Sequence, residues 1–453
     1  MAQGYAQLGG TLTAHAWSGD CTQARRAPRA PTRAPLAHLG TTRGRSPAAL
    51  RRIRRTRPRH APVRCATHPA LTRCRAAARA CAQVAVCPNS AEIHVYRCEP
   101  VGEPSRWERV AVLREHDQAV SGLDWAARSG LLLSCAHDRN IYVWTPPSSP
   151  GGAWAPALVV HHLARAALCA AWSPCERKFA VGSGSGALAV CYYEAENNWW
   201  VGKLAGKKAH GASVLACAWH PTAPLLATAC ADGRARVLAA PVRGVDAEQG
   251  PEAPRFGDVL LVCEPGAGWV HSVAWAPGGD TLAYVSHAGG VHLVTRLDAG
   301  RARDWAAAAP PAAAPPLPLD GRLPSLAVTF LSDTLAVAGG FSCSPLLLAR
   351  GARGWAVAGE LAGGEAGGAG GGDKKSAFSE RLATFKAQTE RGEGGDDAAG
   401  APTGVHQNTI TAVRRLPRPS AGIVFSTSGA DGRLAVWAAD DALAARLGSM
   451  SLA

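Results

Sequence analysis

Residues 116–144 read HDQAVSGLDWAARSGLLLSCAHDRNIYVW. Within them VSGLDW, LLLSC and AHDRNIYVW are short apolar or alternating runs separated by turn-forming residues, which indicates three short strands. The pattern recurs in LCAAW and in LACAW, so that Trp125, Trp172 and Trp219 follow one another at intervals of 47 residues. A period in this range indicates a protein built from repeated small sheets.

More widely spaced copies follow, and their extra residues are expected in loops. They are HSVAW ending at Trp275, LAVTF ending at Phe330 and ITAVRRL starting at Ile410. A seventh copy is split, because LTAHAW ends at Trp17 and VAVCPNSAEIHVY begins at Val84. Trp17 lies 108 residues before the next repeat tryptophan, and removing the 60 residues 24–83 leaves 48. The chain is therefore predicted to be an all-β, seven-bladed β-propeller of WD40 type, formed by residues 1–23 and 84–440.

A polar set recurs at fixed offsets in three of the copies. The sets are His116, Ser134, Asp138 and Trp144; His210, Thr228, Asp232 and Leu238; and His406, Thr427, Asp431 and Trp437. In each set the Ser or Thr lies four residues before the Asp, and the third strand closes six residues after it. We expect a buried hydrogen-bond chain that fastens the loop entering a blade to its inner strands. A catalytic Ser–His–Asp site is rejected because the same trio occurs in several blades, and no catalytic, cofactor-binding or metal-binding residue is predicted.

The formal net charge of +14 is concentrated in residues 24–83, which hold 16 arginines and no Asp, Glu or Lys. The rest of the chain has 32 basic and 34 acidic residues, so it is nearly neutral. Arg- and Pro-rich sequence buries too little apolar surface to offset its chain entropy, and we expect a disordered insert in the first blade. Three interpretations stay open: retained intron sequence or a gene-model error, a basic arm for nucleic acid or acidic surfaces, and a targeting segment.

Other classes of site and location find little support in the sequence. The cysteines sit singly in apolar runs, which is typical of a reducing compartment, and no run reaches the roughly 18 apolar residues of a membrane helix. The GSGSG run at 182–186 lies between two strands and not before a helix, so a nucleotide site is rejected. The insert's cysteines and histidines lack the spacing of a zinc site. The residues considered are Cys65, Cys74, Cys81, His60 and His68.

The closing strand of the ring, a long segment between the sixth and seventh copies, and a C-terminal tail complete the predicted domain organisation. Residues 5–13 are expected to form the outer strand of the blade that ends near Trp437, which closes the ring. Residues 351–405 are expected to be a Gly-rich linker carrying a helix at 376–388, and residues 441–453 a C-terminal tail. Phe378, Leu382 and Phe385 form an apolar stripe on this helix. We favour docking of the stripe on another protein; the alternatives are folding back onto the propeller or disorder.

Adjacent tryptophans at positions 199 and 200 follow two asparagines in a connection between strands. Adjacent indoles on a loop are typical of an interface anchor, and Trp199 and Trp200 are therefore candidate partner-binding residues. The alternative is that they pack at the outer edge of the blade.

Several strings together resemble one known family. They are HAW at 15–17, CPN at 87–89, HDRNIYVW at 137–144, KFAVGSGS at 178–185, ENNWW at 196–200, WHP at 219–221 and GWVHSV at 268–273. The chain resembles the WD40 propeller subunit of the actin-related protein 2/3 complex, which nucleates branched actin filaments, and the resemblance covers all seven blades. It implies that a helix between the sixth and seventh blades protrudes and touches an actin-type subunit. The implied partner-binding residues on it are Phe378, Arg381, Leu382, Phe385 and Lys386. The insert has no counterpart in the family pattern, which strengthens the artefact interpretation.

The function expected from this resemblance is that of a non-catalytic scaffold subunit that contributes to actin filament nucleation and branching. Its expected partners are the other subunits of the complex and the actin filament, with nucleation-promoting factors as further candidates and neither membrane nor nucleic acid expected. The expected location is the cytoplasm and cytoskeleton, and no cofactor is expected. The alternative is another WD40 adaptor that uses its basic insert to bind nucleic acid or acidic partners.

Overall fold

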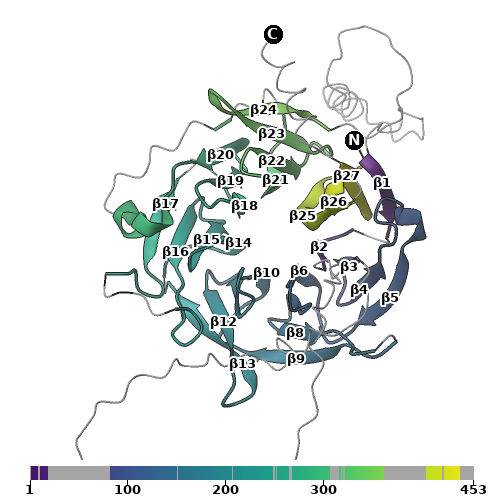
Figure 1. Cartoon of the computed structure of the whole chain (residues 1–453), viewed down its shortest axis with the longest axis horizontal. Helices are drawn as coiled ribbons and strands as arrows, with labels where there is room; N and C mark the ends of the chain where they lie inside the picture. The colour runs from purple at the N-terminus through teal and green to yellow at the C-terminus, as the bar shows by residue number, and fades with distance from the viewer. Residues whose placement is uncertain are drawn as a thin grey trace, which may run out of the picture.

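The computed structural model shows a ring of small sheets whose first strands lie nearest the centre (Figure 1). The described residues are 2–8, 11–18, 82–149, 151–206, 208–247, 250, 252–264, 268–306, 316–317, 319, 322–361, 405–420 and 423–438. Within them there are 27 strands and two short 3-10 helices, η1 (Pro104–Arg106) and η2 (Ala299–Ala306). The strands form seven blades, and the prediction of a seven-bladed propeller is confirmed.

The first four blades each contain four antiparallel strands. Blade 1 has β2 (Ala14–Trp17), β3 (Gln83–Cys87), β4 (Ile93–Arg97) and β5 (Glu108–Leu113). Blade 2 has β6 (Val120–Trp125), β7 (Leu132–Ala136), β8 (Ile141–Thr145) and β9 (Ala155–Val160). Blade 3 has β10 (Ala167–Trp172), β11 (Lys178–Ser183), β12 (Leu188–Glu194) and β13 (Trp199–Ala205). Blade 4 has β14 (Val214–Trp219), β15 (Leu225–Cys230), β16 (Ala235–Ala239) and β17 (Val259–Cys263).

The last three blades complete the circle. Blade 5 has β18 (Val270–Trp275), β19 (Leu282–Ser286) and β20 (Gly290–Val294). Blade 6 has β21 (Ser325–Phe330), β22 (Leu335–Gly340), β23 (Leu346–Gly351) and β24 (Gly354–Glu360). Blade 7 has β25 (Ile410–Ser420), β26 (Ile423–Gly429), β27 (Arg433–Ala438) and β1 (Ala2–Gln7).

The split first blade forms as predicted. β2 pairs with β3 in antiparallel register, with Trp17 opposite Val84. The backbone N–H of Ser18 donates to the carbonyl of Gln83 at 2.9 Å, and the N–H of Gln83 donates to the hydroxyl of Ser18 at 2.8 Å. These bonds tie together the two ends of the insert. Because Gln83 lies in β3, the boundary that we expected after residue 83 was wrong, and the blade resumes earlier.

The ring is closed by an N-terminal strand, as expected, but this strand is β1 (Ala2–Gln7) and does not span the expected residues 5–13. β1 pairs with β27, with Gln7 opposite Arg433. The first blade also contacts the last one through side chains. The buried imidazole of His15 on β2 contacts the hydroxyls of Ser426 at 2.8 Å and Ser428 at 3.1 Å on β26. Trp17 donates its indole N–H to the same Ser426 at 2.8 Å. The first and last blades are thus joined by backbone and side-chain hydrogen bonds that satisfy buried polar groups.

Neighbouring blades stack face to face through buried apolar side chains, because alternate residues of each strand point to opposite faces of its sheet. One buried lysine reinforces such a contact. Lys178 of blade 3 donates to the carbonyl of Ala240 at 2.7 Å and to the carboxylate of Asp246, and its ammonium lies 4.8 Å from the ring centre of Trp219. A buried ammonium needs such partners, and these three belong to blade 4 and the loop after its third strand.

Blade 6 extends further along the chain than expected. We expected an excursion over residues 351–405, but β24 (Gly354–Glu360) is the outer strand of this blade and Leu361 is buried. The pairing of β23 with β24 requires only a tight turn, in which Gly354 has a φ of 117°. The helix expected at 376–388 and the tail at 441–453 lie outside the described residues, as do residues 24–81 of the insert.

The inner strands all run in the same direction, which gives the ring two distinct faces. At the beginning of these strands, Thr13 donates its hydroxyl to the carbonyl of Val120 at 3.1 Å. At their end, the backbone N–H of Trp172 donates to the carboxylate of Asp124 at 2.6 Å. We call the side on which the inner strands begin the start face and the opposite side the end face. The inner strands surround a central cavity of about 570 Å³.

Candidate interaction surfaces

The polar set of blade 2 forms a continuous hydrogen-bond chain near the start face. Trp144 donates its indole N–H to the hydroxyl of Ser134 at 2.9 Å, and this hydroxyl lies 2.8 Å from Nε2 of His116. Nδ1 of His116 faces a carboxylate oxygen of Asp138 at 2.9 Å. Burial lowers the pKa of His116 although Asp138 opposes this shift, so the ring is neutral at pH 7. This series of hydrogen bonds holds the loop before β6 against the turn after β7.

Blade 7 contains the same arrangement. Trp437 donates to the hydroxyl of Thr427 at 2.7 Å, which lies 2.7 Å from Nε2 of His406. Nδ1 of His406 lies 3.2 Å from Asp431. Asp431 also accepts hydrogen bonds from backbone N–H groups on both sides of the loop. The structure therefore brings together all four residues of this set.

Blade 4 departs from the expected pattern. His210 contacts Thr228 at 2.9 Å, but Asp232 turns to Arg236, whose guanidinium donates to its two oxygens at 3.0 and 2.8 Å. The expected His210–Asp232 contact is therefore wrong, because a guanidinium takes both carboxylate oxygens. Burial opposes ionisation of Asp232, but the hydrogen bonds from Arg236 and Gly211 outweigh it and lower its pKa to about 2.

None of these networks has the geometry of a catalytic site. In blades 2 and 7 the hydrogen bonds run from an indole to a carboxylate inside the blade, and the imidazoles of His116 and His406 are fully enclosed, with 0% side-chain exposure. No group of three or more His, Cys, Asp or Glu among the described residues could hold a metal ion. The same part of the chain contains no helix long and apolar enough to cross a membrane.

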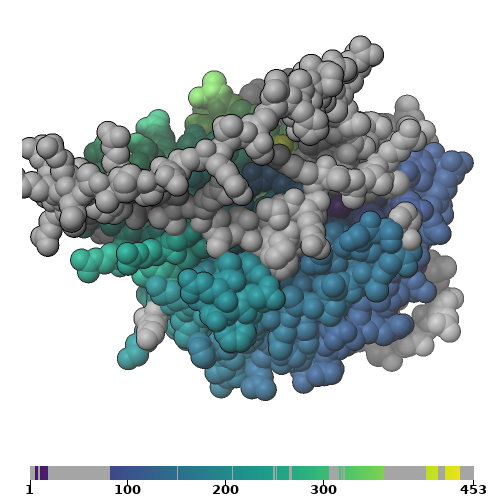
Figure 2. Space-filling view, turned by 60° about the horizontal axis from the view of Figure 1, so that its bottom comes forward, coloured from purple at the N-terminus to yellow at the C-terminus, as the bar shows by residue number. Residues whose placement is uncertain are grey.

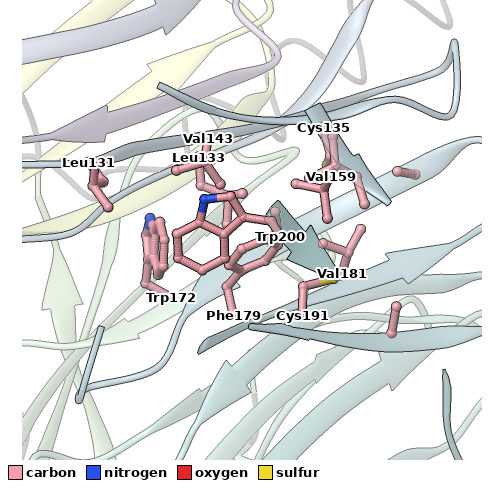
Figure 3. Packing of buried hydrophobic residues seen from close by; sticks show 14 of the residues in the cluster. Leu131, Leu133, Cys135, Val143, Val159, Trp172, Phe179, Val181, Cys191 and Trp200 are labelled. Atoms are coloured by element: carbon pink, nitrogen blue, oxygen red, sulfur yellow. The ribbon is translucent and has the colours of Figure 1, made fainter. Parts of the chain in front are cut away.

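The two adjacent tryptophans have different environments. Trp200 is 1% exposed and packs between blades 2 and 3, against the rings of Trp172 and Phe179 (Figure 3). The ring of Tyr193 lies beside it as well, with ring centres 5.5 Å apart. Its expected role as a partner-binding residue is therefore wrong, because the side chain belongs to the core. The alternation of side chains along β13 turns Trp199 the opposite way.

Trp199 remains a candidate for partner contact. Its side chain is 47% exposed, and its indole N–H donates to Glu194 at 3.2 Å. It begins the outermost strand of blade 3, so it lies at the rim of the ring. Blades 1 to 4, in blue to teal, form a continuous packed surface at this rim (Figure 2). A fixed, half-exposed indole on such a surface is suited to burial by a partner.

A second set of exposed aromatic side chains lies on the start face at blades 5 and 6. Trp269 is 57% exposed and precedes β18, and Phe341 is 36% exposed and follows β22. Between them, Nε2 of His271 lies 3.2 Å from Nδ1 of His287. Successive ring centres along the series Trp269, His271, His287 and Phe341 are 6.2, 5.4 and 6.2 Å apart. We call these four residues the aromatic cluster.

The residues of the aromatic cluster were not among the predicted partner-binding residues. The GWVHSV string contains a usable signal, because Trp269 stands just before the alternating run, where a loop ends and a strand begins. Phe341 carried no such signal, because nothing in the sequence shows that the turns of blades 5 and 6 lie side by side. The remaining predicted partner-binding residues, Phe378, Arg381, Leu382, Phe385 and Lys386, lie outside the described residues.

The fold and these surfaces define the class of protein, a WD40-type β-propeller that offers two faces and a rim. The family model for the WD domain, G-beta repeat, matches residues 107–145 and 202–237. The chain is 38% identical over 366 residues to actin-related protein 2/3 complex subunit 1B of Arabidopsis thaliana, covering 78% of this chain and 90% of that protein. It is 37% identical over 347 residues to subunit 1 of Schizosaccharomyces pombe, covering 73% and 88%. Subunit 1A-B of Xenopus laevis is 36% identical over 273 residues, which cover 58% of this chain and 68% of that protein.

The chain therefore belongs to the actin-related protein 2/3 complex subunit 1 family. The resemblance seen in the sequence is confirmed. Neither the family model nor these relatives carry the name of an enzyme.

Proposed function

We propose that this protein is a non-catalytic scaffold subunit of an actin-related protein 2/3 complex, where it contributes to actin filament nucleation and branching through protein–protein contacts. The observation that carries the proposal is the similarity to subunit 1 proteins over about nine-tenths of their length. Its partners would be the other subunits and the actin filament, with nucleation-promoting factors as further candidates, and its location the cytoskeleton.

The architecture supports a scaffold role. A subunit that holds several neighbours must keep its loops in fixed positions, and the two complete polar networks fasten the start-face loops of blades 2 and 7 to the strands behind them. Pairing with β1 covers the edge of β27, which in an open ring would be free to pair with another chain.

Three regions are proposed to meet partners. Trp199 would contact a neighbour at the rim, and the aromatic cluster would be covered by a neighbour at the start face. The third is the segment 376–388, whose Phe378, Leu382 and Phe385 would dock on another protein, with Arg381 and Lys386 beside them. For the remaining segments, we propose that 24–81 is an insert outside the ring and 441–453 a tail.

The proposal is tested by affinity purification of the tagged full-length chain from cell extract. We expect the actin-related subunits to be recovered together with it. A Trp199→Ala/Trp269→Ala double variant should recover less of them, while a control at the partly buried aromatic Tyr192, Tyr192→Phe, should recover as much as the original chain.

The alternative function rests on the 16 arginines of the insert. If the chain recovers only nucleic-acid-binding proteins, the scaffold proposal is overturned. In that case binding to nucleic acid should weaken steeply with salt and be lost on deletion of residues 24–81.

A further inference from the structure

Two thiols from neighbouring blades face each other near the ring axis. Cys169 lies on β10 of blade 3 and Cys217 on β14 of blade 4, and their sulfur atoms are 3.8 Å apart. Both side chains line the central cavity of about 570 Å³. Cys169 stands three residues before its repeat tryptophan and Cys217 two before its own, so they point to opposite faces of their sheets and meet where the two sheets stack.

The surroundings hold the sulfur atoms only weakly. Apart from Cys217, the hydrogen-bond acceptor of Cys169 Sγ is the carbonyl of Val214 at 3.8 Å, and Cys217 Sγ lies 3.9 Å from the carbonyl of Ala180. Gly182 provides the room, because a Cβ at this position would lie 2.7 Å from Cys169 Sγ. A disulfide bond needs about 2.05 Å between its sulfur atoms, and two side chains without strong competing contacts can rotate toward each other.

We propose that Cys169 and Cys217 are an oxidation site at which a peroxide forms a disulfide between blades 3 and 4. The thiolate of Cys169 attacks a peroxide oxygen, so that a sulfur–oxygen bond forms, the oxygen–oxygen bond breaks and one water leaves after protonation. Cys217 then attacks the sulfenic sulfur, the sulfur–oxygen bond breaks, and the hydroxide leaves as water with the proton of Cys217. Two thiols are oxidised and one hydrogen peroxide is reduced to two waters. Disulfides of this kind in a reducing compartment are transient and responsive to oxidant.

The order of the two steps follows from the environment of Cys217. Its hydrogen bond with Cys169 and its burial raise the pKa of the Cys217 thiol well above its usual range. A raised pKa makes the thiolate of Cys217 scarce, and since the thiolate is the nucleophile toward peroxide, Cys217 is assigned the second step. The bond would tie together inner strands that otherwise meet only through non-covalent contacts.

The test uses the full-length chain treated with hydrogen peroxide, alkylated with N-ethylmaleimide and digested without reduction. Mass spectrometry should show the peptide with Cys169 joined to the peptide with Cys217, lighter than the two reduced peptides by two hydrogen atoms. The melting temperature should rise by roughly 4 °C and return after dithiothreitol, because the crosslink restricts the unfolded chain.

Single Cys169→Ser and Cys217→Ser variants should each lose the joined peptide and the reversible rise in melting temperature. A Cys135→Ser variant is the matched control, because Cys135 is a buried thiol of blade 2 whose sulfur lies 3.7 Å from the hydroxyl of Ser121. This variant should keep both signals. Oxidation of Cys169 only to sulfinic or sulfonic acid, or a crosslink that joins Cys135 instead, would overturn the proposal.

Discussion

Acidification should destabilise this propeller well before most carboxylates are protonated, because buried histidines are held neutral. Burial, with a further contribution from Arg236, lowers the pKa of His210 to about 4. Burial also lowers the pKa of His292 to about 4. The unfolded value is about 6.5, so between pH 6.5 and pH 4 the unfolded chain binds these protons and the folded chain does not. Stability therefore falls as the pH decreases through this window.

The magnitude follows from the two pKa values. At about 1.36 kcal/mol per pKa unit, each histidine removes about 2 kcal/mol of unfolding free energy between pH 6.5 and pH 5, or about 4 kcal/mol for the pair. Marginal stabilities of about 5–15 kcal/mol make this a large fraction of the total. The measurement is urea unfolding followed by tryptophan fluorescence at about pH 7, 6 and 5.

The reasoning is checked with a His210→Gln/His292→Gln double variant. Glutamine keeps a hydrogen-bonding side chain but binds no proton in this range, so the acid-induced loss should shrink by about 4 kcal/mol whatever the cost of the substitutions at pH 7. His162 is exposed, and His162→Gln is the control that should leave the pH dependence unchanged. If the double variant loses stability with acid as steeply as the original chain, the two imidazoles are not held neutral and the explanation fails.

Three further predictions concern the insert, the paired tryptophans and the segment between blades 6 and 7. Deleting residues 24–81 should raise stability by about 2 kcal/mol, since it shortens the closed loop roughly tenfold; a lower melting temperature would show that the insert belongs to the fold. Trp200→Ala should cost about 3–5 kcal/mol in urea unfolding and Trp199→Ala less than about 1 kcal/mol, and equal costs would refute their assignment to core and rim. Serine at three apolar positions should slow actin branching in a reconstituted assay with little change in melting temperature, whereas a large drop would mean that the segment packs on its own ring. These positions are Phe378, Leu382 and Phe385.

Most of the fold could be predicted from the sequence repeat. Spacing between tryptophans and strand alternation are local properties, so the seven blades, the pairing of Trp17 with Val84 and the closing strand could all be predicted. The polar networks of blades 2 and 7 formed as expected for the same reason, because each lies within one blade and the loop before it.

The sequence-based predictions failed where two residues compete for the same hydrogen-bonding partner, or where a contact joins two blades. Asp232 had two candidate partners, and only the geometry of the third strand shows that Arg236 reaches it. Trp200 was misplaced because its burial depends on the neighbouring blade, whose Val159 pairs with it across a parallel contact between the two sheets. The buried ion pair of Lys178 was not predicted for a similar reason, since its partner Asp246 lies 68 residues away along the chain.

The two long excursions leave the ring on opposite sides, because residue 18 follows an inner strand and residue 405 precedes one. A reporter domain spliced between Ser18 and Ala82 would therefore emerge from the side away from the aromatic cluster. Such a fusion could follow the protein in a living cell while leaving the opposite surface open to its neighbours.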